Sequence, residues 1–216
     1  MTIKIIVTAF VVLVVGAYIV LQREVPEINS DNIEPAMIME YSKPDHFRQT
    51  PNDCGPYNVA AVVRALKNVE VSSAEFAEDI TWRLPNNYTL PIGLEKQLKE
   101  NGVFVRAYSL KSFEDHLRID FLLENLSLKR PVIILGEQDG YEHYITLFGF
   151  DSAEDEFYLY DSIVKAGNPG MTTDLNAFAP GNKSMTAEEL LEFWRGGGTY
   201  GVYNWYAIAS SERYFK

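Results

Sequence analysis

The sequence predicts an α+β fold, with helices mainly in the first half of the chain and an antiparallel sheet in the second. Residues 54–67 carry an apolar stripe at helical spacing, whereas residues 143–151 and 156–162 alternate as strands around a short acidic turn. Strands and helices do not alternate regularly, which argues against a parallel βαβ sheet. The 216 residues suffice for one domain with a hydrophobic core and an N-terminal extension.

The extension begins with an uncharged apolar run at residues 5–22 that follows Lys4. Its length is close to the ~20 residues that cross a bilayer, and exceeds the roughly 7–15 apolar residues of a signal peptide. We therefore predict a signal anchor over residues 1–22, a transmembrane helix whose positively charged side stays in the cytoplasm, with the domain extracytoplasmic. The alternative is cleavage near residues 15–17, which would yield a secreted protein.

The composition of residues 23–46, with three prolines and no apolar periodicity, predicts an extended, polar connector. The domain, residues 47–216, then opens with the helix over residues 54–67, in which Pro56 suits the first turn. A second helix is expected over residues 73–84, started by a serine cap, and a third over residues 92–100, ended by Asn101-Gly102.

The second half of the domain supplies most of the sheet. We expect a strand at residues 103–110, a helix at 112–128 and a buried strand at 131–136, followed by the hairpin of 143–151 and 156–162. Residues 163–183 predict a long loop, because they are rich in Gly, Asn, Pro and Thr. A capped helix over residues 186–195 and a final strand within 196–210 close the chain.

Charge and composition exclude several functions. The net charge of -11 disfavours binding to nucleic acid or to anionic lipid head groups, and is typical of a solvated acidic surface. One Cys, three scattered His and no HExxH motif give no zinc-like ligand set, and the acidic turn lacks EF-hand spacing. We therefore expect neither a metal nor a cofactor.

The single cysteine, Cys54, is the first candidate for chemistry. A lone cysteine forms no internal disulfide, so in an exported domain it is either an inert buried side chain or a reactive thiol. Cys54 stands at the start of the predicted helix, where unpaired N–H groups and the helix dipole favour a thiolate. Gln49, five residues ahead, is a candidate donor to an oxyanion.

A base and an orienting acid follow far downstream. His143 opens the first hairpin strand and Asp161 ends the second, so paired strands would bring the two side chains together. His46, in the connector, and His116, on the predicted solvent face of a helix, are weaker candidates for the base. Asp151 also ends a strand and is the alternative acid, although such an Asp is often only a turn former.

Together these residues resemble the papain-like cysteine peptidases related to the bacteriocin-leader-processing, or double-glycine, peptidases, and in particular their stand-alone members. The resemblance spans roughly residues 47–210 and is carried by Gln49, the Asp-Cys-Gly-Pro motif at 53–56, His143 and Asp161. It implies a papain-like fold, in which an N-terminal catalytic helix packs on an antiparallel sheet. It also implies Cys54 as nucleophile, His143 as base and then acid, Asp161 as orienter and Gln49 as oxyanion donor.

Three positions depart from the family pattern: Tyr57 and Asn58 replace small residues, and Ser162 stands where Pro is frequent. No phosphate-binding Gly-Lys-Ser/Thr loop is present, so the sequence shows no fused transporter ATPase.

The predicted function is therefore a thiol hydrolase that cleaves peptide or amide bonds of a peptide or protein through an acyl-enzyme on Cys54. Transfer of the acyl group to an amine would use the same residues. The alternative, motivated by Tyr57 and Asn58, is an inactive peptidase fold that binds peptides at the membrane surface.

Overall fold

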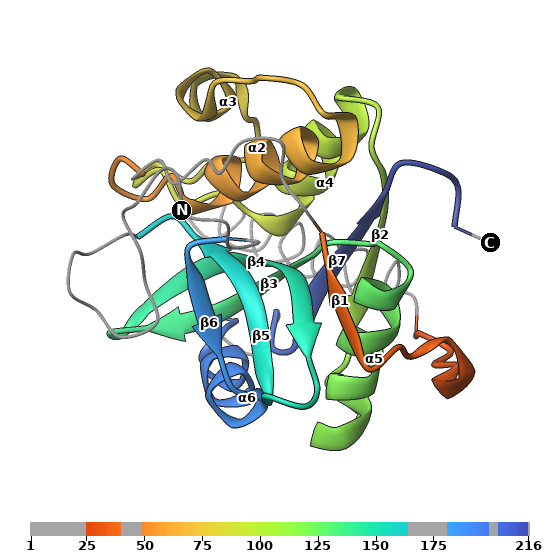
Figure 1. The fold of residues 1–216 in the computed structure, drawn as a ribbon. Coiled ribbons are helices and arrows are strands. Elements are labelled where there is room, and N and C mark those ends of the chain that lie inside the picture. The colour runs from red at the N-terminus through yellow and green to blue at the C-terminus, as the bar shows by residue number, and fades with distance from the viewer. Residues whose placement is uncertain (1–24, 40–48, 164–180, 199–202, 216) are drawn as a thin grey trace, which may run out of the picture.

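The computed structural model describes residues 25–39, 49–163, 181–198 and 203–215 (Figure 1). Within these ranges, no helix is both long enough and apolar enough to cross a membrane. The predicted transmembrane segment, residues 5–22, lies outside the described residues and stays a prediction.

An antiparallel sheet forms the centre of the domain, as predicted. Its main path runs β2-β7-β3-β4-β5-β6, and β1 pairs with the far end of β4. The strands are β1 (Ala36–Ile38), β2 (Phe104–Ser109), β3 (Val132–Gln138), β4 (Tyr141–Asp151), β5 (Glu156–Asp161), β6 (Lys183–Met185) and β7 (Tyr206–Ser211).

Helices cover both faces of this sheet (Figure 1). They are α2 (Cys54–Lys67), α3 (Ser73–Asp79), α4 (Pro91–Glu100), α5 (Asp115–Ser127) and α6 (Ala187–Gly196), with a short 3₁₀ helix at Ser30–Asn32. Helices α2, α3 and α4 pack on one face, whereas α5 and α6 pack on the other. The fold is thus α+β, with the helix that begins at Cys54 lying on an antiparallel sheet.

Strand β3 shows why the sheet is buried on both faces. Ile133 and Leu135 belong to the apolar cluster under α2 and α4, whereas Val132 and Ile134 belong to the cluster under α5 and α6. A continuous apolar run is what a strand needs when both of its faces are covered.

One expectation about elements was wrong, and two strands were not predicted. The helix from residue 73 ends at Asp79 instead of residue 84, since Ile80 already has an extended backbone with a ψ of 135° and Trp82 has a left-handed φ of 61°. The connector contains the short strand β1, which hydrogen-bonds to β4. Residues 164–180 of the predicted loop lie outside the described residues, and the strand β6, which begins at its end, pairs with β5.

Candidate active site

Cys54 is the first residue of α2 and is 5% exposed. The preceding residue, Asp53, is the N-cap, and its side chain forms no capping hydrogen bond with the helix. The thiol therefore lies at the positive end of the helix dipole, and no acidic residue lies in the first turn of the helix.

His143 and Asp161 form a buried pair, and the pairing of the two hairpin strands explains why their side chains lie close together. Ile145 is the cross-strand partner of Asp161, and His143 lies two residues from Ile145 on the same face of β4. The imidazole Nε2 lies 2.7 Å from Asp161 Oδ1, and the two side chains are 2% and 0% exposed.

Charge balance at this pair shifts both pKa values. Burial alone would lower the pKa of His143, but the hydrogen bond and charge of Asp161, then those of Cys54, raise it to about 9. Burial would raise the pKa of Asp161, but His143, Lys183 and the Ile163 N–H lower it. The arrangement therefore favours an imidazolium beside a carboxylate, and the Cys54 side chain adds to the same shift.

Two residues that sequence reasoning missed hold Asp161 in place. Asn182 accepts from the Asp161 N–H at 2.8 Å and donates to its carbonyl at 2.7 Å, and Lys183 Nζ lies 3.2 Å from Asp161 Oδ2. Both residues follow the Gly- and Asn-rich segment, where no motif or periodicity singles them out. Only the pairing of β6 with β5 brings them to the site.

Gln49 reaches the same corner through Ser162, the residue after Asp161. The Gln49 N–H donates to the Ser162 carbonyl at 3.0 Å, and the Ser162 hydroxyl donates to Gln49 Oε1 at 2.6 Å. The structure thus relates the four predicted site residues: His143 is hydrogen-bonded to Asp161, Gln49 is hydrogen-bonded to the residue after Asp161, and the Cys54 side chain helps to raise the pKa of His143.

Asn58 ties the nucleophile's helix to the strand of His143. Its side-chain amide donates to the carbonyls of Cys54 and Tyr144, both at 2.8 Å, and its Oδ1 accepts from Thr146 at 2.6 Å. This departure from the family pattern is therefore a fully buried polar bridge between α2 and β4.

The site has an adjacent cavity of about 540 Å³, with Cys54 in its wall. One side is the segment before α4, which supplies Leu84, Tyr88 and Leu90, and the other includes Tyr141 and Tyr144 of β4. The first side is held by Arg83, whose guanidinium contacts the Asp53 carboxylate and donates to the Ala77 and Asn87 carbonyls. Asp53 also accepts from Thr50.

The other candidates lie elsewhere. His116 is exposed on α5 beside Glu114, and Asp151 accepts hydrogen bonds from the turn after β4. His46 falls outside the described residues. No group of three or more His, Cys, Asp or Glu that would hold a metal ion occurs among the residues the structure places.

Comparison with known proteins identifies a family. The sequence profile described as "Peptidase_C39 like family" matches residues 40–184. Among curated proteins, none matches this chain.

Two solved structures of peptidases share the fold, and a third is reported beside them. The peptidase domain of Streptococcus ComA, a bifunctional ABC transporter involved in a quorum-sensing pathway, is 16% identical with a TM-score of 0.51, over 80% of this chain and 99% of that one. Xylellain, a cysteine protease from Xylella fastidiosa, is 8% identical with a TM-score of 0.50, over 90% and 93%. A double-glycine-motif protease from an AMS/PCAT transporter, solved with its leader peptide, is 14% identical with a TM-score of 0.48, over 82% and 98%.

Proposed function

The chain belongs to the Peptidase C39-like family, and from this premise we propose that it is a cysteine peptidase that cleaves peptide bonds through an acyl-enzyme on Cys54. The observation that carries the proposal is the buried hydrogen bond between His143 and Asp161, together with a cysteine at the start of α2 whose side chain helps to raise the pKa of His143. A nucleophile, a base and a group that orients the base are what acyl transfer from an amide requires.

In the proposed mechanism, the Cys54 thiolate attacks the carbonyl carbon of the scissile peptide bond. The new C–S bond converts the carbonyl into a tetrahedral oxyanion, which Gln49 and the backbone N–H of Cys54 stabilise by donating hydrogen bonds. The C–N bond then breaks as His143 gives its proton to the leaving amine. Water, deprotonated by His143, attacks the thioester and releases the carboxylate product and the thiolate. Asp161 keeps the imidazole oriented throughout.

The cavity beside Cys54 supports a peptide as the substrate. Its lining is mainly tyrosine and leucine side chains, including Tyr88, Tyr144 and Tyr203. Such a lining favours substrates with apolar or aromatic side chains close to the scissile bond. Transfer of the acyl group to an amine would use the same residues, so the assay measures both the hydrolysis product and the transfer product.

The proposal is tested by incubating the domain, residues 24–216, with a random peptide library and identifying the products by mass spectrometry. We expect wild-type protein to cleave a subset of peptides, and Cys54→Ala to cleave none while retaining its thermal unfolding midpoint. Cleavage by both proteins would disprove the role of Cys54. Binding of peptides by both without cleavage by either would favour the inactive binding module.

We also propose, from the sequence alone, that residues 5–22 hold the domain at the extracytoplasmic face of a membrane. Full-length protein should stay in the membrane fraction after an alkaline carbonate wash, and protease added outside the cell should remove the domain. Release by the wash would disprove the anchor.

A further inference from the structure

Ser162 has no part in the predicted set of site residues, yet it contacts one of its members twice. It is fully buried and directly follows Asp161 at the end of β5. Its carbonyl accepts from the Gln49 backbone N–H at 3.0 Å, and its hydroxyl donates to Gln49 Oε1 at 2.6 Å. The backbone and the side chain of Gln49 are therefore both attached to the same residue.

The direction of the side-chain hydrogen bond decides what Gln49 can do. A glutamine amide has one accepting end and one donating end, and the two have nearly the same shape. Because the Ser162 hydroxyl occupies Oε1, the two N–H groups of Gln49 point away from it. Those N–H groups are the ones that an oxyanion donor needs.

Ser162 follows a residue, Asp161, that contacts three other residues of the site. The backbone N–H and carbonyl of Asp161 both form hydrogen bonds with the side chain of Asn182. The Asp161 carboxylate binds His143 and Lys183. Asp161 and Ser162 thus fix the imidazole and the glutamine from one strand end. A displacement of either residue would affect the general base and the oxyanion donor together.

We propose that Ser162 is a positioning residue that turns the amide of Gln49 so that its N–H groups face the oxyanion formed at Cys54. The inference rests on the proposed function, since it needs an acyl transfer at Cys54. The hydroxyl contributes through Gln49 alone and does not act on the thiol or on His143.

Two reagents separate this role from a general structural one. p-Nitrophenyl acetate acylates a thiolate through a tetrahedral oxyanion and releases p-nitrophenolate as the C–O bond breaks. Iodoacetamide alkylates the same thiolate by displacing iodide at a saturated carbon, so no oxyanion forms. A residue that positions only the oxyanion donor should slow acylation and leave alkylation unchanged.

The experiment measures both rates for wild type, Gln49→Ala, Ser162→Ala and the double variant. Loss of an oxyanion donor costs about 10²–10³-fold, so we expect a loss of that order for Gln49→Ala and roughly 3–30-fold for Ser162→Ala, in acylation alone. In the Gln49→Ala background, Ser162→Ala should cause no further loss. Thermal unfolding of each variant checks that the fold is retained.

The outcomes are distinct. The reference is a free thiol that iodoacetamide alkylates at the same rate as the wild-type protein. If p-nitrophenyl acetate acylates the wild type no faster than this free thiol, both the proposed function and the inference are overturned. A fast wild type with an equally fast Ser162→Ala, or with losses that multiply in the double variant, would overturn the inference alone. Ser162→Thr keeps the hydroxyl and should stay within about threefold of wild type. If this variant were as slow as Gln49→Ala, the hydroxyl would not be the cause.

Discussion

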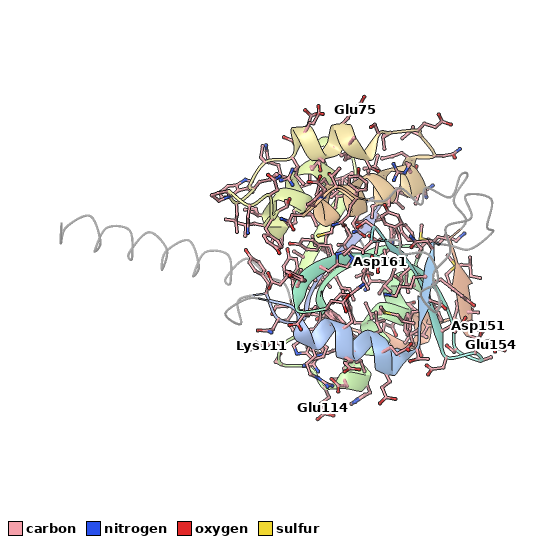
Figure 2. The ribbon with its side chains drawn as sticks, turned by 90° about the vertical axis from the view of Figure 1, so that its left-hand side faces the viewer. Glu75, Lys111, Glu114, Asp151, Glu154 and Asp161 are labelled. Carbon is pink, nitrogen blue, oxygen red and sulfur yellow. The ribbon has the colours of Figure 1, made fainter. Side chains whose placement is uncertain are left out.

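Both strands of the β4–β5 hairpin end in an aspartate, Asp151 at the turn and Asp161 at the end of β5. The surroundings of the two carboxylates differ. Asp151, at the turn, accepts from the N–H groups of Ala153 and Glu154 at 2.9 and 3.4 Å. Asp161, at the other end, is fully buried and binds His143 and Lys183. Figure 2 shows Asp161 inside the molecule and Asp151 with Glu154 at its edge.

The difference shows that position at a strand end does not decide the role of an aspartate. Asp151 meets backbone donors of its own turn, a local arrangement that any loop can offer. Asp161 is removed from water and balanced by cationic partners brought from β4 and β6. Its charge is therefore available to hold an imidazolium, and the pKa of Asp161 is lowered accordingly.

The largest effect is expected when each of the two carboxylates is removed in turn. Asp161→Ala should lower the acylation rate by roughly 10²–10⁴-fold, because His143 loses its orienting partner and its stabilising charge. Asp151→Ala is the matched control and should leave the rate within about twofold while costing less than about 1 kcal/mol of unfolding free energy. Equal losses in the two variants would mean that the hairpin, and not the buried pair, controls the chemistry.

A smaller effect is expected from the polar bridge that joins the buried end to the nucleophile's helix. Asn58→Ala would leave the Tyr144 carbonyl and the Thr146 hydroxyl without their partner in a fully buried place. We expect a loss of about 2–4 kcal/mol in unfolding free energy, measured by urea denaturation.

The comparison for this bridge is Asn87→Ala, at an exposed position with a left-handed φ of 68°. There the expected loss is about 1 kcal/mol, from backbone strain alone. A loss for Asn58→Ala no larger than that would show that the bridge adds little to the stability of the fold.

Much of this site could be predicted from the sequence, because its signals are local. A cysteine before an apolar helical stripe and two alternating segments joined by a turn suffice to place Cys54, His143 and Asp161 on their elements. The structure confirms that order of helices and strands.

The partners of these residues could not be predicted, because they come from segments without periodicity. Lys183 and Asn182 reach Asp161 only through the β5–β6 pairing, and Ser162 reaches Gln49 across a sequence separation of 113 residues. The early end of α3 could not be predicted either, because no Gly or Pro in residues 73–84 marks the change to an extended backbone at Ile80.

The smallest predicted effect is a shift along the pH axis. The folded pKa of His143, about 9, lies above its ordinary value of 6.5, so its protonated form contributes stability that is complete below about 6.5 and is lost as the pH rises through about 9. Because His143 gives its proton to the leaving amine, peptide cleavage should decline as the pH rises through about 9. In Asp161→Asn the geometry is kept but the charge is gone, so burial dominates and the decline should begin roughly 1–3 pH units lower. Asp151→Asn should leave the profile unchanged. If the cleavage rates of Asp161→Asn and wild type decline at the same pH, the charge of Asp161 does not set the protonation of His143.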